Sequence, residues 1–177
     1  MNLYILRHAS AGLRRINPLL DSKRPLDKEG KRQCIQLAHV LNGLDIQFDL
    51  IISSPLKRSL QTASLIGTET GYEARILQSP ALAPSATFKE FQKLLRDHAS
   101  CENLLVVGHN PNLSSFLGSL LVPPNGAEAR VRLRKGSLAR VVLTRGPATL
   151  QSLVDPRIVR ALYATSTKSS RRKTSRK

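Results

Sequence analysis

Three strand-sized apolar runs, each followed by a polar loop and a helical pattern, limit the folds open to this chain. The runs are 2–6, 48–52 and 104–107, all far shorter than the ~20 residues of a membrane span. Repeated strand–loop–helix units favour parallel strands lying side by side, with helices packed over the sheet. We therefore expect an α/β fold with a mixed sheet.

Capping residues mark where the predicted helices begin and end. The first helix opens at 27 or 28, and Gly43 stands where a carboxyl-terminal cap is expected. Ser54 and Asn110 are predicted to cap helices that follow apolar runs, because each precedes a proline that suits the first helical position. Thr87 and Glu90 have the spacing of a capping box.

The remaining strands are predicted in the middle and at the end of the chain. A third strand is expected within 73–77. Segments 130–134 and 138–143 flank a Lys-Gly-Ser turn and are interpreted as a hairpin, followed by a last strand at 149–154. Segment 9–26 contains Gly and Pro and no periodicity, which predicts a long functional loop.

The charge of the chain is unevenly distributed. The net charge is +16 over 177 residues, and 164–177 contributes six Lys or Arg and no acid. This segment is nearly free of apolar side chains, so we expect a disordered basic tail after one domain at 1–163. The acid-free stretch 130–145 carries six more cations, but these alternate with apolar residues and are expected to be folded.

The sequence also limits compartment and metal chemistry. The amino-terminal residues lack the basic, apolar and small-residue pattern of a secretory signal. Cys34 and Cys101 show no CxxC spacing, and no paired histidines accompany them as a zinc site would need. We expect a reduced, cytoplasmic protein without membrane contact.

Three predicted strands end in residues suited to binding phosphate. Arg7 and His8 follow the first strand, 53–58 follows the second, and His109 follows the run at 104–107. The carboxyl ends of strands in open α/β sheets are where ligands bind, so these exits can converge on one crevice. Arginine matches phosphate oxygens in pairs, and one histidine can attack phosphorus while another donates a hydrogen bond. Such a site needs no metal and no cofactor.

These segments resemble the signatures of the histidine phosphatase superfamily. Leu-Arg-His-Ala at 6–9 is similar to its first motif, 53–63 to its second, and Val-Val-Gly-His-Asn-Pro at 106–111 to the segment with its second histidine. The chain is similar to the compact SixA-type phosphohistidine phosphatases. Residues 21–26, together with Gly30, resemble the first long loop of those enzymes. The likeness covers about 2–160. It implies a phosphoglycerate mutase-like, three-layer α/β/α fold with a mostly parallel sheet and no large insertion domain.

The resemblance also implies a role for each matching residue. His8 would be the nucleophile, Arg7 and Arg58 would bind phosphate, and His109 would stabilise the transition state. Asp21 and Arg24 would either form an ion pair within the long loop or lie at the rim of the site, where they could bind substrate.

The chain departs from the family pattern at two positions. Many members have a Glu or Asp that protonates the leaving group where this chain has Ala81, and an Asp two residues after the nucleophile, where this chain has Ser10. Both departures favour a substrate whose leaving group needs little protonation. The resemblance then predicts a metal-independent phosphatase acting on phosphohistidine of a protein in signal transduction, with inorganic phosphate as product.

Three alternatives remain open from sequence. The enzyme could be a phosphomonoesterase for a sugar or nucleotide phosphate, or a phosphate-binding scaffold that has lost turnover. The basic segments could instead indicate a nucleic-acid-binding protein. Aromatic residues make up 4% of the chain, with no Trp, so a base-stacking surface is not indicated, although the tail could contact nucleic acid weakly.

Overall fold

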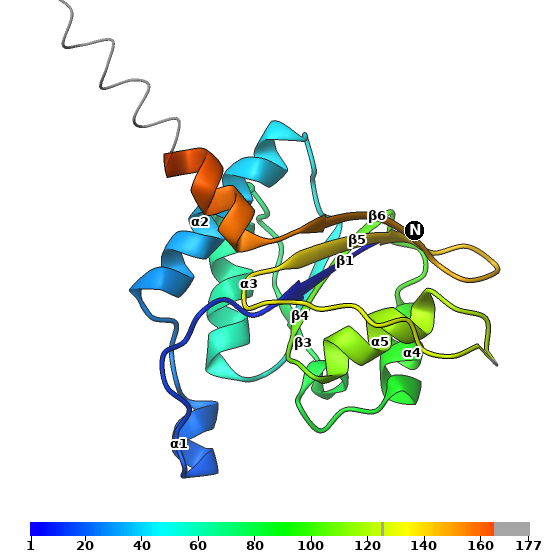
Figure 1. The fold of residues 1–177 in the computed structure, drawn as a ribbon, viewed down its shortest axis with the longest axis horizontal. Coiled ribbons are helices and arrows are strands. Elements are labelled where there is room, and N and C mark those ends of the chain that lie inside the picture. Colours follow the sequence, from blue (N-terminus) through cyan, green and yellow to red (C-terminus); the bar gives the residue numbers. More distant parts are fainter. Residues whose placement is uncertain (125, 165–177) are drawn as a thin grey trace, which may run out of the picture.

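A six-stranded sheet forms the centre of the molecule, for which the computed structural model describes residues 1–124 and 126–164 (Figure 1). The order in the sheet is β3-β2-β4-β1-β5-β6. The strands are β1 (Asn2–Arg7), β2 (Leu50–Ser53), β3 (Leu77–Gln78), β4 (Asn103–Gly108), β5 (Leu138–Val142) and β6 (Thr149–Val154). Strands β3, β2, β4 and β1 run parallel, whereas β5 and β6 are antiparallel to their neighbours, which confirms the mixed sheet.

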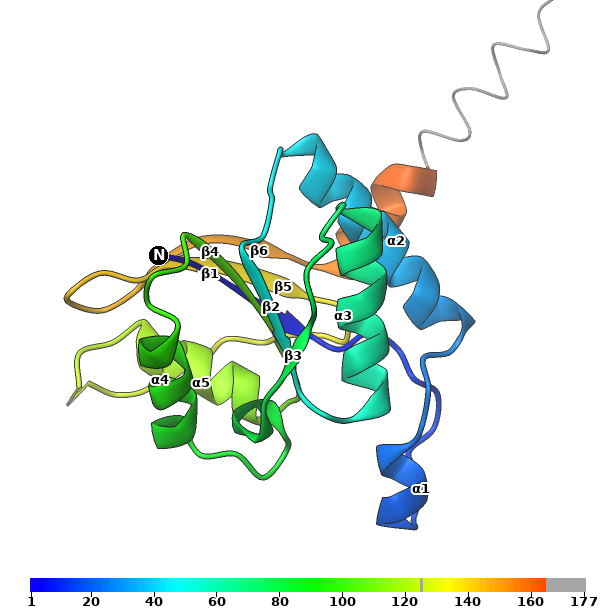
Figure 2. The same ribbon diagram turned by 180° about the vertical axis from the view of Figure 1, so that it is seen from behind.

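Helices cover both faces of this sheet. The helices of the chain are α1 (Pro18–Ser22), which projects from the body, α2 (Lys28–Gly43), α3 (Lys57–Glu69), the 3₁₀ turn η1 (Pro80–Leu82), α4 (Phe88–Asp97), α5 (Asn112–Leu120) and a helix over 156–164. Figures 1 and 2 show α2 and α3 on one face and α4 and α5 on the other. The three-layer α/β/α architecture is therefore confirmed.

The central strands are apolar on both sides because each side packs against helices. In β1, Leu3 and Ile5 belong to the core beneath α4 and α5, whereas Tyr4 and Leu6 belong to the core beneath α2 and α3. The residues of β4 alternate in the same way. Side chains alternate between the faces of a strand, so a sheet covered twice needs continuous apolar runs.

The capping box at Thr87 is confirmed, and Asp27 caps α2 through Gly30 N. Three other predicted caps, at Ser54, Gly43 and Asn110, are wrong. Helix α3 begins only at Lys57, with Leu56 at its N-cap and no side-chain cap; the Ser54 hydroxyl lies before the helix, where it contacts His109 and accepts from the Leu56 N–H. Helix α2 runs through Gly43, and the left-handed backbone conformation falls on Asp45, with φ of 51°.

Asn110, which precedes Pro111, does not cap α5. That helix begins at Asn112 with Pro111 at its N-cap, and the Asn110 side chain instead donates to the Leu133 carbonyl. This bond turns the amide toward Leu133, and Asn110 Oδ1, the atom that would accept from a helix N–H, is buried without a hydrogen-bond partner among the described residues.

The predicted hairpin around 135–137 is also wrong. Only 138–142 forms a strand, β5, and its partners are β1 and β6. Segment 130–134 is not a strand, because site side chains take up its backbone groups: the Leu133 carbonyl accepts hydrogen bonds from both Arg7 and Asn110. The last strand, Thr149–Val154, is confirmed, and the strand expected within 73–77 is reduced to the short β3.

A helix over 156–164, which was not predicted, follows β6 and lies beside α2. Arg160 of this helix forms an ion pair with Glu29, and the Tyr163 hydroxyl lies 2.9 Å from His39 Nδ1. The predicted tail lies outside the described residues, apart from Ala164. In the described part of the chain, no helix is long and apolar enough to cross a membrane.

Candidate active site

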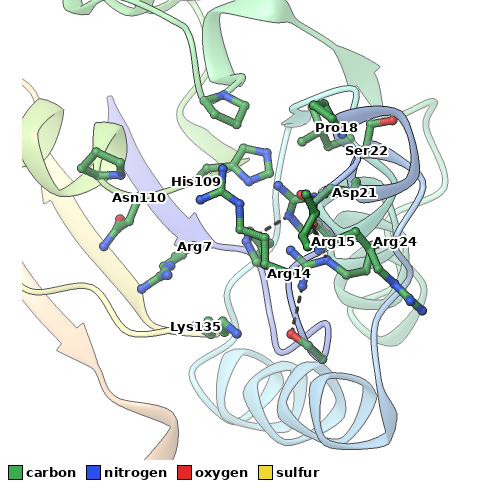
Figure 3. A pocket seen from close by; sticks show the side chains of 17 residues that line it. Arg7, Arg14, Arg15, Pro18, Asp21, Ser22, Arg24, His109, Asn110 and Lys135 are labelled. Carbon is green, nitrogen blue, oxygen red and sulfur yellow. Dashed lines mark hydrogen bonds and ion pairs between the residues drawn. The ribbon is translucent and has the colours of Figure 1, made fainter.

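A cavity of about 530 Å³ opens where β1, β2 and β4 end (Figure 3). The three strand exits are joined by backbone hydrogen bonds, from His8 N to Gly108 O and from Ser54 N to Val107 O. The cavity is lined by Arg7, His8, Gly12, Arg14, Arg15, Ile16, Pro18, Asp21, Ser22, Arg24, Leu56, Arg58, Pro84, His109, Asn110, Pro111 and Lys135. All six side chains predicted from the sequence for this site are among them.

His8 is buried directly after β1, with its two ring nitrogens in different environments. Nδ1 lies 2.8 Å from the Ala9 carbonyl oxygen, which can only accept, so we assign the ring proton to Nδ1. Arg58 Nε donates to His8 Nε2 across 3.3 Å. Burial, with added repulsion from Arg58 and Arg7, lowers the pKa of His8 to about 3. The ring is therefore neutral near pH 7, with a lone pair on Nε2.

His109, directly after β4, faces His8 with the ring centroids 5.0 Å apart. Its Nε2 lies 2.8 Å from Ser54 Oγ and 3.2 Å from Ser59 Oγ. Its Nδ1 is buried without a hydrogen-bond partner among the described residues. Burial, reinforced by positive charge nearby, lowers the pKa of His109 to about 2. When a serine hydroxyl donates to Nε2, the ring proton is on Nδ1 and can be donated to a ligand.

Two guanidinium groups bring positive charge to the same cavity. Arg7 Nη1 donates to the Leu133 carbonyl, and its buried Nε has no partner among the described residues. Arg58 Nη1 donates to the Asp21 carbonyl and approaches the Asp21 carboxylate at 3.3 Å. Burial lowers the pKa of both arginines, but arginine stays charged in proteins. Each has N–H groups left for an oxyanion.

Asp21 and Arg24 form an ion pair within the loop and also lie at the rim. Arg24 Nε donates to Asp21 Oδ1 at 2.9 Å, and Arg24 Nη1 donates to the carbonyls of Ala11 and Gly12. A hydrogen bond from the Arg15 backbone N–H, together with Arg24, holds the pKa of Asp21 below its usual range. Asp21 is therefore a carboxylate that accepts hydrogen bonds near pH 7.

The comparisons with known proteins agree with this geometry. The sequence profile of the histidine phosphatase superfamily (branch 1) matches residues 3–83, which include Arg7, His8 and Arg58. An uncharacterised protein of Picosynechococcus sp. (strain PCC 7002) is 30% identical over 158 residues, which cover 88% of this chain and 92% of the relative. The chain belongs to the histidine phosphatase superfamily.

Solved structures match the fold over nearly its whole length. The protein histidine phosphatase SixA complexed with tungstate has a TM-score of 0.79 at 23% identity, covering 90% of this chain and 99% of that one. The alpha-ribazole phosphatase of Shigella flexneri has a TM-score of 0.69 at 19% identity, covering 88% and 97%. The fold is thus SixA-like and phosphoglycerate mutase-like, as predicted, and the chain is a phosphatase of this superfamily.

Several residues of this histidine phosphatase site were not predicted. Arg14, Arg15 and Lys135 line the cavity, and Ser59 contacts His109 from the buried side of α3. The adjacent Arg14 and Arg15, in a loop without periodicity, were the one local sequence signal for the basic rim of the cavity. The contact of Ser59 with His109 joins residues 50 positions apart, so no local pattern marks it.

The two departures from the family pattern have clear structural settings. Ala81 packs against the core beneath α4 and α5, so a methyl group occupies this position. Ser10 donates to Asp27 Oδ2 at 2.7 Å and thereby joins the loop after β1 to the start of α2. Within residues 1–124 and 126–164, no cluster of three or more His, Cys, Asp or Glu side chains could hold a metal ion.

Proposed function

We propose that this phosphatase hydrolyses phosphohistidine on a protein, through a covalent phosphohistidine at His8 and without a metal. The supporting observation is the state of His8: its proton is on the nitrogen that faces Ala9, and its Nε2 lone pair points to Arg58 in the cavity. A histidine held in this way is ready to attack phosphorus at neutral pH.

The reaction consists of two displacements. His8 Nε2 forms a bond to phosphorus while the bond to the leaving group breaks, and the ring becomes a cation whose Nδ1–H donates to the Ala9 carbonyl. Arg7, Arg58 and the His109 Nδ1–H contact the equatorial oxygens, where the charge of the transition state is spread. Water then attacks phosphorus, the bond to Nε2 breaks, and inorganic phosphate leaves.

The choice of phosphohistidine rests on the available proton donors. An alkoxide leaving group needs a proton, and a positioned acid contributes typically ~10²–10⁴-fold to its departure. Among the described residues, Asp21 is the one carboxylate that lines the cavity, and its lowered pKa leaves it without a proton near pH 7. An imidazole leaving group, with an ordinary pKa near ~6.5, requires much less help.

A small phosphate ester is the second candidate, because the cavity of about 530 Å³ can hold one and the fold is also similar to that of an alpha-ribazole phosphatase. The two candidates differ in how the rate depends on the leaving group. We expect kcat/KM to fall steeply across phenyl phosphates as the pKa of the phenol rises, phosphohistidine to be cleaved rapidly, and alkyl phosphates to be nearly inert.

The decisive assay compares phosphohistidine, the phenyl phosphate series and a sugar phosphate, each with and without EDTA. Rapid hydrolysis of the sugar phosphate, or a flat dependence on the phenol pKa, would favour the small-molecule candidate. Activity that is lost with EDTA and restored by a divalent metal would contradict the metal-independent mechanism.

A further inference from the structure

We infer that residues 12–24, here called the arm, dock the protein that carries the phosphohistidine, and that they recognise aliphatic and acidic side chains flanking the phosphorylated residue. This inference rests on the proposed function and adds a partner chemistry to it. Three properties of the arm support it: its exposed aliphatic surface, its position at the cavity, and the positive charge around it.

The aliphatic side chains of the arm are unusually exposed. Relative exposure is 89% for Leu13, 103% for Ile16, 74% for Leu19 and 58% for Leu20, all within eight positions of the chain. Figures 1 and 2 show α1 projecting away from the body of the molecule, and no other element of the described part of the chain covers it. Single exposed apolar residues are ordinary, but a cluster of this kind marks a contact surface.

The arm is also part of the wall of the catalytic cavity. Arg14, Arg15 and Ile16 line it together with Arg58 and His8. Figure 3 shows Arg14 and Arg15 at the side of the cavity formed by Asp21 and Arg24. A protein held by the exposed leucines would therefore be bound beside the mouth of this cavity. A small substrate bound at the bottom of the cavity would have no use for Leu13 or Leu19, because neither lines it.

Hydrogen bonds at the base of the arm hold it in place. Arg24 donates to the carbonyls of Ala11 and Gly12, and Asp21 accepts from the Arg15 backbone N–H at 2.9 Å. Arg58, a phosphate-binding candidate, donates to the Asp21 carbonyl at 2.9 Å. The arm is thus joined to the phosphate site, and a partner meets a surface that is already shaped.

The charge around the cavity points to an acidic partner. Of the described residues that line it, six are Lys or Arg and one, Asp21, is an acid. A neighbouring cavity of about 330 Å³ adds Arg132, Arg134 and Arg157 and shares Arg7 and Lys135. A phosphoryl group supplies a charge of about −2 at most, so this basic surface is matched only by a ligand with further negative charge.

The probes for this inference are three peptides of equal length whose single histidine is phosphorylated with phosphoramidate. The first has Glu and Leu beside the histidine, the second Glu and Ser, and the third only Ser and Gly. The small substrate 4-nitrophenyl phosphate provides the basal activity. The arm variant is L13S/L19S/L20S, and the control is L44S, which removes a leucine of comparable exposure beyond the end of α2.

We expect wild type to favour the Glu/Leu peptide over the Ser/Gly peptide by about tenfold or more in kcat/KM, with the Glu/Ser peptide between them. The arm variant should reduce the Glu/Leu peptide to the level of the Glu/Ser peptide through a higher KM. Its turnover of 4-nitrophenyl phosphate should stay within about twofold of wild type. The L44S variant should behave as wild type with every substrate.

Other outcomes overturn the inference in distinguishable ways. Equal rates of wild type on all three peptides would refute docking while leaving the proposed function standing. An equal loss on all substrates in the arm variant would make the arm a lid over the cavity. If wild type sediments with anionic vesicles and the arm variant does not, while the arm variant keeps the peptide preference of wild type, the arm is a membrane-binding surface. No hydrolysis of any phosphohistidine peptide by wild type would refute the proposed function, and docking with it.

Discussion

At the residue scale, the protonation of His8 is the feature that most directly sets reactivity. With a folded-state pKa of about 3, His8 stays neutral where an ordinary histidine, with a pKa near ~6.5, becomes charged. We predict that ¹⁵N-correlated NMR will show His8 neutral and protonated on Nδ1 down to about pH 5, with the signal assigned from His8→Asn. A midpoint between pH 6 and 7 would contradict the burial argument.

The same shift makes the free enzyme sensitive to acid. Between about pH 6.5 and 3, the unfolded chain binds a proton at this histidine and the folded chain does not. The free energy of unfolding contributed by His8 is therefore fully present above pH 6.5 and decreases as the pH falls toward 3. His109, whose pKa is lowered in the same direction, adds to this loss.

Ser54 is predicted to set the tautomer of His109. Its hydroxyl lies 2.8 Å from His109 Nε2, and donation from this hydroxyl keeps the ring proton on Nδ1, the nitrogen without a hydrogen-bond partner among the described residues. Ser54→Ala should lower kcat on 4-nitrophenyl phosphate about fivefold to tenfold, as the loss of a hydrogen bond of about 1 kcal/mol implies, and should shift the ¹⁵N signals of His109. Unchanged signals with a lower kcat would mean a purely structural role for Ser54.

The strand exits that bring Arg7, His8, Arg58 and His109 to the cavity were predictable, because each ends an apolar run that is recognisable as a strand. The serines behind His109 were not, since a hydroxyl that contacts a side chain some 50 positions away leaves no trace in local spacing. The balance between the two roles of Asp21 and Arg24 likewise needed the structure, because the loop that contains them has no periodicity.

At the element scale, the start of α2 lies unusually close to the loop after β1. A Cβ added to Gly30 would lie 2.0 Å from the Ser10 carbonyl oxygen, whereas one added to Gly43 in the same helix would meet nothing within 4 Å. Gly30→Ala should therefore displace the loop next to His8, lowering both Tm and turnover of 4-nitrophenyl phosphate. Gly43→Ala should leave turnover unchanged and raise stability slightly, by about 0.5–1 kcal/mol.

Thermal unfolding and turnover of the two glycine variants, measured side by side, test this expectation. If Gly30→Ala resembles Gly43→Ala in both, the close approach of α2 to Ser10 does not shape the site.

Apolar runs and helical periodicity located the main strands and helices, but the ends of elements were less predictable. Ser54 and Asn110 have good capping chemistry, yet both helices begin further along the chain, and the two side chains point to His109 and to the Leu133 carbonyl. The supposed hairpin failed for a similar reason, because the carbonyl of Leu133 is taken up by Arg7 and Asn110. Helix ends and strand partners near a functional site depend on contacts that only the folded chain shows.

At the scale of the whole molecule, the alternation of strands and helices was enough to predict the α/β class, while the resemblance supplied the three layers. The order β3-β2-β4-β1-β5-β6 was not predictable, because apolar runs buried on both faces do not specify their neighbours. The helix over 156–164 was missed, since most of its residues are exposed and its apolar contact with the body is limited to a few positions such as Val159.

The basic tail allows a test of the nucleic-acid alternative. Ending the chain at Ala164 removes six Lys or Arg but keeps Tyr163, which contacts His39. We predict that the shortened chain keeps its turnover of 4-nitrophenyl phosphate and loses salt-dependent retention on DNA, because clustered charge governs such binding. Retention that persists after shortening would instead assign DNA binding to the folded domain.

The central claim is that His8 carries the phosphoryl group during turnover. Rapid quenching after mixing with a ³²P-labelled substrate, followed by peptide mapping, tests it most directly, with His8→Ala as the matched variant. The account predicts acid-labile, base-stable label on the peptide that contains His8, and neither label nor substantial turnover in His8→Ala. Label on another residue, or a variant that turns over substrate like wild type, would contradict it.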